Sequence, residues 1–241
     1  MSPVSPAVIP PCILVTGANR GIGVAIVGRC LLQSKEMHIV LAFSELRKAD
    51  AKFQKLTAIV NNAGIAYGST ANILNVNTLG PKRIDDDFLP FLDMAAPGKP
   101  RIVQISSGAA PRCVQSSSAK RRSFFMETPN VTWEKISAVV DEVNQGSGAK
   151  GGDLTKGELK KQFGIGSLKG PGSSAYSLSK ALLNLYTSWR TKECGDNVRV
   201  NAFSPGAIAT DLFSESAFAC IMRKIMKSPD SGTKSTLLLL F

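Results

Sequence analysis

Short apolar, β-prone runs alternate with helical patterns along most of the chain. Five runs of this kind are found, at residues 12–16, 38–43, 57–60, 101–106 and 198–203. Continuous apolar runs of this length are typical of strands that are buried on both faces, as in a parallel sheet. Helical patterns are expected at residues 24–33, 45–56, 73–94 and 174–192. The alternation predicts an α/β fold with a doubly wound parallel sheet.

Three segments depart from this alternation. Residues 1–11 are rich in Pro and Ser and contain no Lys or Arg, so we expect a disordered leader and not a signal peptide. Residues 109–173 are rich in Ser, Gly and Lys, and the pattern predicts a helix only from Trp133 to Asn144. The segment after Asp211 is expected to contain helix, loop and a short terminal helix. The chain is therefore expected to form one domain over 12–241, with an insertion at about 109–173.

A glycine-rich turn directly follows the first predicted strand. Gly17, Gly21 and Gly23 have the spacing G-x-x-x-G-x-G, and a predicted helix begins at once after them. Glycines let the backbone approach a pyrophosphate, and the N-terminus of a helix directs free N–H groups at it. No GxxxxGK[ST] sequence is present, so a P-loop kinase or GTPase is not expected. A tight turn that binds nothing is the alternative for this motif alone.

Tyr176 and Lys180 are four positions apart and would share one face of a helix. A nearby ammonium favours the tyrosinate and would lower the pKa of the phenol. A phenol tuned in this way can donate a proton to a carbonyl oxygen or accept one from an alcohol. Pairs with this spacing are common on helix surfaces, so the interpretation depends on the motifs that accompany it.

Six motifs in a fixed order make the sequence similar to the short-chain dehydrogenase/reductase family. They are Thr16–Gly23, Asn61–Gly64, Asn77, Ser107, the pair Tyr176 and Lys180, and Asn201–Gly206 with Thr210. The resemblance extends from residue 12 to about residue 240. It implies a Rossmann-type fold and an oxidoreductase that uses a nicotinamide cofactor.

The resemblance also implies a role for each of four catalytic residues. Tyr176 would be the acid/base, and Lys180 would hold the nicotinamide ribose and tune Tyr176. Ser107 would donate a hydrogen bond to the substrate oxygen and stabilise the charge that develops there. Asn77 would anchor a water molecule of a proton relay. Single residues of this set have simpler structural explanations, but their combined presence favours the catalytic interpretation.

The implied cofactor is NADP(H) rather than NAD. Arg20 occupies the basic position that family members use for the 2′-phosphate, and residues 41–44 offer no Asp for a free ribose 2′-hydroxyl. Glu45, one position further on, keeps NAD open as an alternative. Ser44 stands where relatives often carry a second basic residue. The expected cofactor-binding residues are Gly17, Asn19, Arg20, Gly21, Ile22, Gly23, Ser44, Asn61, Ala63, Gly64, Tyr176, Lys180, Pro205, Gly206, Ile208 and Thr210.

Within the family, the carbonyl-reductase branch is the most similar, because a long insertion separates Ser107 from Tyr176. The implied reaction is NADPH-dependent reduction of a small-molecule ketone, aldehyde or quinone to an alcohol. In that branch the insertion covers a helix face that other members use for dimerisation. The resemblance therefore implies a monomer.

Three segments are shorter than the family pattern requires. The stretch from Thr16 to Asn61 lacks room for one helix and for an edge strand that would carry an adenine-binding Asp. The stretch from Gly64 to Asn77 is also short, and the last strand of the sheet is expected to be absent after Thr210. These gaps could impair activity. They favour one alternative, a catalytically decayed reductase that serves as a dinucleotide-binding or scaffold protein.

The net charge raises a further alternative. With 29 Lys+Arg against 18 Asp+Glu, the chain carries a formal charge of +11, which suits an anionic small molecule, a membrane surface or nucleic acid. The densest basic run is Lys120 to Arg122, and no zinc finger or aromatic–basic stripe accompanies it. We therefore expect no nucleic-acid partner. No run of about 18 apolar residues occurs, so no membrane partner is expected either.

Cysteine and histidine usage point away from metal chemistry and secretion. The 5 cysteines are scattered without a CxxC pair, which favours reduced thiols in a cytoplasmic protein. The single histidine, His38, lies in an apolar run with no ligand cluster around it. We expect no metal site, and a hydrolytic triad is disfavoured.

Overall fold

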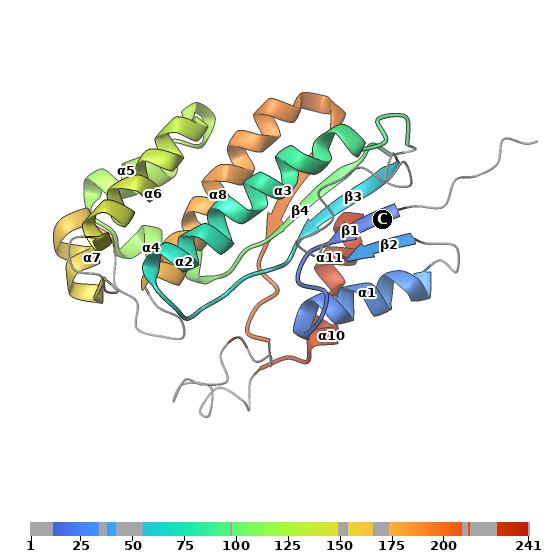
Figure 1. The fold of residues 1–241 in the computed structure, drawn as a ribbon, viewed down its shortest axis with the longest axis horizontal. Helices are drawn as coiled ribbons and strands as arrows, with labels where there is room; N and C mark the ends of the chain where they lie inside the picture. Colours follow the sequence, from blue (N-terminus) through green and yellow to red (C-terminus); the bar gives the residue numbers. More distant parts are fainter. Residues whose placement is uncertain are drawn as a thin grey trace, which may run out of the picture.

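A parallel sheet forms the centre of the computed structural model, which describes residues 12–33, 38–41, 55–96, 98–148, 154–165, 174–208, 212 and 226–240. Its strands are β1 (Cys12–Val15), β2 (His38–Leu41), β3 (Leu56–Asn61), β4 (Arg101–Ile105) and β5 (Arg199–Phe203). Their order is β2-β1-β3-β4-β5, and all neighbouring pairs are parallel (Figure 1). The predicted doubly wound parallel sheet is confirmed.

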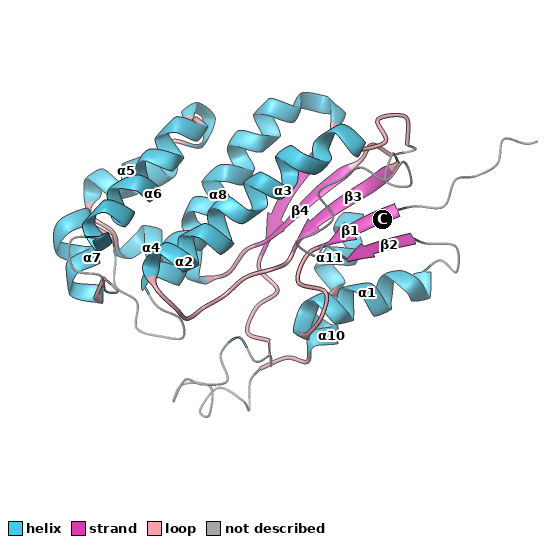
Figure 2. Ribbon diagram, viewed as in Figure 1, coloured by secondary structure: helices cyan, strands magenta, loops and turns pink. Residues whose placement is uncertain are grey.

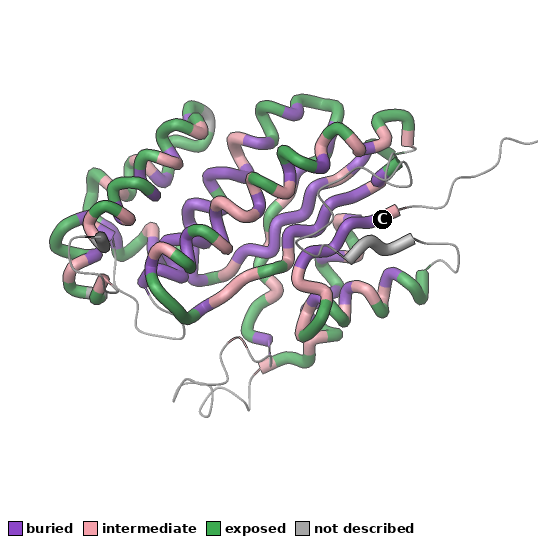
Figure 3. The backbone as a smooth tube through the Cα atoms, viewed as in Figure 1, coloured by how far each residue is buried: buried purple, intermediate pink, exposed green. Residues whose placement is uncertain are grey.

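Helices cover both faces of the sheet (Figure 2). On one face lie α1 (Gly21–Gln33), α10 (Pro229–Gly232) and α11 (Lys234–Leu240), and on the other α3 (Gly80–Phe88) and α8 (Ser174–Cys194). Successive side chains of β1 divide between the two layers: Val15 packs in the cluster that includes Ile26 of α1, whereas Leu14 packs with Phe88 of α3. Burial on both faces explains why β1 is a continuous apolar run. Figure 3 shows β1, β3 and β4 and the inward sides of the helices as the buried part of the molecule.

The insertion folds as a group of helices against α8. These are α4 (Ala109–Ser116), α5 (Ala119–Met126), α6 (Trp133–Gly148) and α7 (Lys156–Phe163). Phe125 and Ile136 of the insertion share one buried cluster with Leu178 and Leu182 of α8. The sequence predicted only the region of α6. The other three helices have 8 residues each, too short to show a clear apolar period.

The helix expected over 73–94 is divided. It consists of α2 (Thr70–Leu74), a π-helical turn (Asn75–Leu79), α3 and a 3₁₀ turn (Leu89–Phe91). Pro81 lies in the first turn of α3, where its missing N–H costs nothing, and Pro90 lies in the 3₁₀ turn. The π turn, which the sequence did not predict, carries Asn77.

Several expectations fall on residues outside the described ranges. They are the leader at 1–11, most of the helix at 45–56, Ser44 and Thr210. Within the described ranges, β2 and β5 are the two edges of the sheet, and only an isolated bridge between Ile208 and Lys227 follows β5. The segments in which further edge strands would lie, 42–54 and 213–225, fall outside the described residues, so their expected absence stays a prediction.

Candidate active site

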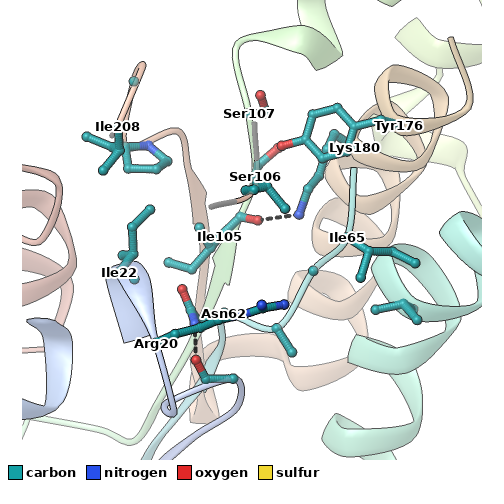
Figure 4. A pocket seen from close by; sticks show the side chains of 18 of the residues that line it. Arg20, Ile22, Asn62, Ile65, Ile105, Ser106, Ser107, Tyr176, Lys180 and Ile208 are labelled. Atoms are coloured by element: carbon teal, nitrogen blue, oxygen red, sulfur yellow. Dashed lines mark hydrogen bonds between the residues drawn. The ribbon is translucent and has the colours of Figure 1, made fainter. Parts of the chain in front are cut away.

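A pocket of about 310 Å³ opens at the carboxyl ends of the strands (Figure 4). Open α/β sheets bind their ligands in this position. Four loops that follow strands, together with α8 and the π turn, supply its lining residues. These are Gly17, Asn19, Arg20, Gly21, Ile22, Asn62, Ala63, Gly64, Ile65, Val76, Ile105, Ser106, Ser107, Tyr176, Lys180, Pro205, Gly206, Ile208 and Leu212.

The turn between β1 and α1 requires its glycines. Gly17 has φ +62°, and a Cβ there would lie 2.8 Å from the Cα of Ala63. A Cβ on Gly23 would lie 2.2 Å from the carbonyl oxygen of Gly17. Gly23 therefore lets α1 pack closely beneath the turn and does not itself line the pocket. Gly21, with φ of 56°, completes the turn.

Hydrogen bonds lock this turn to the loop after β3. The Oγ1 of Thr16 accepts the backbone N–H groups of Asn62 and Ala63, both at 3.0 Å. The Nδ2 of Asn62 donates to the carbonyl oxygens of Thr16 (3.0 Å) and Gly17 (3.1 Å), as Figure 4 shows in part. Thr16 and Asn62 belong to the recognised motifs, but they were not among the predicted site residues. Their role becomes visible only when the two loops are placed side by side.

Asn61 lies beneath the pocket and does not line it. Its side chain is 4% exposed, and its Nδ2 donates to the Oδ1 of Asp85 at 2.7 Å. The predicted contact of Asn61 with a cofactor therefore has no support in its side-chain position. Asp85 was not singled out in the sequence.

Asn77 connects the loop after β3 with α8. Its Nδ2 donates to the carbonyl oxygen of Ile65 (2.8 Å) and to the Oγ of Ser179 (3.0 Å), and its Oδ1 accepts the N–H of Ile65 at 2.9 Å. A Cβ on Gly64 would lie 3.2 Å from this Oδ1 and 3.6 Å from the Nζ of Lys180. The Asn77 amide, Gly64 and the Lys180 ammonium therefore lie side by side.

Lys180 is 5% exposed and donates from Nζ to the carbonyl oxygen of Ile105 at 2.8 Å (Figure 4). Its Nζ lies 5.9 Å from the centroid of the Tyr176 ring. Burial disfavours the charged amine and lowers the pKa of Lys180 to about 8. The side chain thus titrates within the range in which enzymes commonly operate.

Tyr176 is 4% exposed, and burial raises the pKa of its phenol. The hydrogen bond with Ser107 and the charge of Arg112 lower the pKa but do not outweigh burial. This differs from the expectation that Lys180 lowers the pKa of Tyr176. The phenol keeps its proton at neutral pH, which suits a proton donor. Arg112, an exposed residue of α4, was not predicted to act near the site.

The loop after β5 completes the pocket. Ser204 accepts at its Oγ the N–H groups of Gly108 (2.9 Å) and Gly206 (3.3 Å), which joins this loop to the one that carries Ser107. Pro205, Gly206 and Ile208 line the pocket as predicted. Three of the four predicted catalytic side chains, those of Ser107, Tyr176 and Lys180, line this pocket, and Asn77 borders it.

Among the residues that the structure describes, no three His, Cys, Asp or Glu side chains gather as metal ligands. No helix in the same ranges combines the length and apolarity needed to cross a membrane.

Comparison with known proteins gives relatives for both sequence and fold. No protein-family profile matches the chain. A (+)-neomenthol dehydrogenase of Arabidopsis thaliana is 29% identical over 263 positions, which cover 83% of each chain. Carbonyl reductase [NADPH] 1 of Macaca fascicularis is 25% identical and covers 92% of this chain and 87% of its own. Salutaridine reductase from Papaver somniferum has a similar structure, with a TM-score of 0.69, 19% identity and coverage of 96% of both chains.

The sequence alignment with the Arabidopsis protein contains gaps in this chain. The alignment with the Arabidopsis protein extends over 263 positions, although the whole chain has 241 residues. It therefore includes positions at which this chain has no residue. The Papaver structure matches the fold over nearly the full length of both chains. In sequence and in fold, the resemblance to the short-chain dehydrogenase/reductase family is confirmed.

Proposed function

We propose that the protein is an NADPH-dependent oxidoreductase that reduces a ketone, aldehyde or quinone to the alcohol. One observation carries the proposal: the pocket joins the glycine turn to Ser107, Tyr176 and Lys180 in a single cavity. The names of the relatives, a dehydrogenase and an NADPH carbonyl reductase, support the same reaction class.

The turn after β1 fits a dinucleotide. Gly17 and Gly21, both with positive φ, bring the backbone to the pocket surface, and the N-terminus of α1 faces the same space. Arg20 is exposed, lines the pocket and would hold the 2′-phosphate of NADPH. Ser44 and Glu45 lie outside the described residues, so Arg20 is the side chain on which the preference for NADPH rests.

The residues of the chain would position the substrate and supply the proton. A bound NADPH supplies the hydride. Ser107 and Tyr176 would donate hydrogen bonds to the carbonyl oxygen, and Tyr176 would transfer its proton as negative charge develops there. The raised pKa of Tyr176 keeps that proton available at neutral pH. The protonated phenol is the form that reduction of a carbonyl requires.

Lys180 and Asn77 would complete the site. The Lys180 ammonium would hold the nicotinamide ribose, and Asn77 would anchor the water through which Tyr176 regains its proton. The proximity of Gly64 to both the Asn77 Oδ1 and the Lys180 Nζ supports this arrangement. Apolar side chains of Ile65, Ile208 and Leu212 line the rest of the pocket and suit a largely uncharged substrate.

We also propose a monomeric, cytoplasmic protein. The insertion helices pack on α8, where Phe125, Ile136 and Leu182 share one buried cluster, and this supports the monomer that the family resemblance implies. Cys12, Cys30, Cys113 and Cys194 are free thiols, as a reducing compartment allows. Sedimentation equilibrium tests the first point, since a mass of 25.6 kDa is expected.

The activity is tested with the purified full chain. NADPH consumption is followed against a panel of ketones, aldehydes and quinones, and the alcohol product is identified. Stoichiometric formation of alcohol supports the proposal. A folded protein that binds NADPH but reduces no carbonyl would contradict it and favour the decayed reductase.

A further inference from the structure

A single buried carboxylate connects three elements of the proposed site. Asp85 of α3 is 0% exposed. Its Oδ1 accepts the Nδ2 of Asn61 at 2.7 Å, and its Oδ2 accepts the Nε2 of Gln104 at 2.8 Å and the hydroxyl of Tyr186 at 2.6 Å. Three donors thus converge on one side chain that takes no part in the proposed chemistry.

The three donors stand directly beneath the pocket walls. Asn61 and Gln104 are register partners on β3 and β4. The residues that follow them, 62–65 and 105–107, line the pocket. Tyr186 lies on α8, the helix that carries Tyr176 and Lys180. Asp85 therefore fixes two strand ends against the catalytic helix.

The Asp85 carboxylate determines which way the side-chain amide of Gln104 is turned. The Oε1 of Gln104 is buried and has no hydrogen-bond partner in the described part of the chain. An unpaired buried oxygen costs free energy. Turning the amide over would place that oxygen against the Asp85 carboxylate. The amide nitrogen instead donates to Asp85, and the Oε1 stays buried without a hydrogen-bond partner in the described part of the chain.

Charged and titratable groups surround Asp85 on two helices. From α8, Tyr186 donates a hydrogen bond to Asp85, and Arg190 donates from Nε to the Tyr186 oxygen at 2.9 Å. Burial and the charge of Asp85 both raise the pKa of the Cys194 thiol on the same helix. From α3, Asp86 pairs with both Lys82 and Arg190. Asn61 and Gln104, the contacts from β3 and β4, are uncharged. All three hydrogen-bond partners act as donors, so the arrangement suits the ionised carboxylate.

We propose that Asp85 is a positioning residue of the reductase site. Its carboxylate sets the ends of β3 and β4 against α8 and so places the Ile105 carbonyl opposite the Lys180 ammonium. This inference rests on the proposed function. A protonated Asp85 would present an O–H to groups that are themselves donors, and the ends of β3 and β4 would move relative to α8.

The consequence is an acidic limb in the pH profile. Burial raises the pKa of Asp85 to about 6, so the carboxylate is ionised at neutral pH and is lost as the pH falls below that value. Tyr176 and Lys180 both keep their protons in this range, so neither explains a loss of kcat. The NADPH 2′-phosphate also titrates in mild acid and could produce an acidic limb of its own. Measurement at saturating NADPH, together with the variants, distinguishes its titration from that of Asp85.

The test compares the kcat profiles of wild type, Asp85→Asn and Asp86→Asn. Asp86→Asn is the matched control, because Asp86 contacts neither Asn61 nor Gln104. We expect kcat of Asp85→Asn to fall about 10- to 100-fold at neutral pH, to lack the acidic limb, and to leave KM for the carbonyl much less affected. Asp86→Asn should keep the limb. A wild-type kcat or a persistent acidic limb in Asp85→Asn would overturn the proposal.

If Asp85→Asn does not fold, Tyr186→Phe tests the role of Asp85 in its place. The Tyr186 hydroxyl lowers the pKa of Asp85, so its removal should move the acidic limb to higher pH. A purely structural role would reduce stability without moving the limb. An unmoved limb would therefore overturn the proposal.

NADPH titration separates this proposal from the proposed function. If wild type reduces no carbonyl, the reductase proposal fails. The affinity for NADPH then reports whether the ends of β3 and β4 are correctly placed against α8. Asp85→Asn, or Tyr186→Phe in its place, should then bind NADPH more weakly than wild type and Asp86→Asn. Equal affinities, or no binding by wild type, would overturn the role of Asp85.

Discussion

The Nζ of Lys180 lies 2.8 Å from the carbonyl oxygen of Ile105. This contact joins α8, the helix that carries Tyr176 and Lys180, to the end of β4, one residue before Ser106 and two before Ser107. The amine is buried, and a charged amine without water depends on such partners. The position and the protonation state of Lys180 therefore depend on the end of β4.

The pH dependence of turnover should carry a basic limb from Lys180. Burial lowers its pKa to about 8, and lysine is charged below its pKa, so the ammonium is lost as the pH rises above that value. We expect kcat/KM to fall in that range. Lys180→Arg keeps its charge at alkaline pH, so any activity that it retains should show no such limb. An unchanged basic limb in Lys180→Arg would assign the titration to another group.

The same shift predicts a change in stability. The folded-state pKa of Lys180, about 8, lies below the ordinary lysine pKa of 10.5, so the unfolded chain binds more protons between these values. The free energy of unfolding that Lys180 contributes should rise as the pH increases through this range. Urea denaturation at a series of pH values should show the rise in wild type and its loss in Lys180→Met. Parallel curves for both proteins would contradict the buried amine.

Two glycines of α1 provide a matched pair. A Cβ on Gly23 would clash with Gly17, whereas a Cβ on Gly28 meets nothing within 4 Å. Gly23→Ala should destabilise the fold by about 1–3 kcal/mol and weaken NADPH binding. Gly28→Ala should stabilise it by about 0.5–1 kcal/mol, because alanine favours the helix. Urea denaturation and NADPH titration measure both, and equal effects at the two positions would argue against the close packing of the turn.

Arg20 should decide between the two nicotinamide cofactors. A charge-assisted hydrogen bond to a phosphate contributes roughly 1.5–3 kcal/mol, so Arg20→Ala should weaken NADPH binding about 10- to 100-fold. Affinity for NADH should change little, because NADH lacks the 2′-phosphate. The dissociation constants of both cofactors are compared for wild type and variant. A similar loss for NADH would show that Arg20 supports the turn itself.

The sheet and the recognised motifs could be predicted because their signals are local. β1 is a continuous apolar run, β4 carries the apolar residues Ile102, Val103 and Ile105, and the glycine turn follows directly after β1. Tyr176 and Lys180 share a helix face by spacing alone. The pocket that unites these segments follows from parallel topology, since all strands end at the same edge.

Other features depend on packing that the sequence does not display. Asp85, Asp86 and Asp87 form an acidic run typical of a solvated helix face, yet Asp85 is fully buried. Only the approach of α3 to β3 and β4 turns this side chain inward. The raised pKa of Tyr176 arises in the same way, because its burial outweighs nearby charge. The effect of Arg112 on Tyr176 likewise requires α4, which was not predicted.

The most direct test of the central claim is single-turnover reduction by Tyr176→Phe. The variant keeps the ring and removes the hydroxyl, and Tyr67→Phe, at an exposed position, serves as the control. Saturating NADPH and a carbonyl accepted by wild type are mixed with each protein, and oxidation of the cofactor is followed. The account predicts near-complete loss of oxidation in Tyr176→Phe, retained NADPH binding, and a wild-type rate in Tyr67→Phe. A rate in Tyr176→Phe close to that of wild type would show that another group supplies the proton.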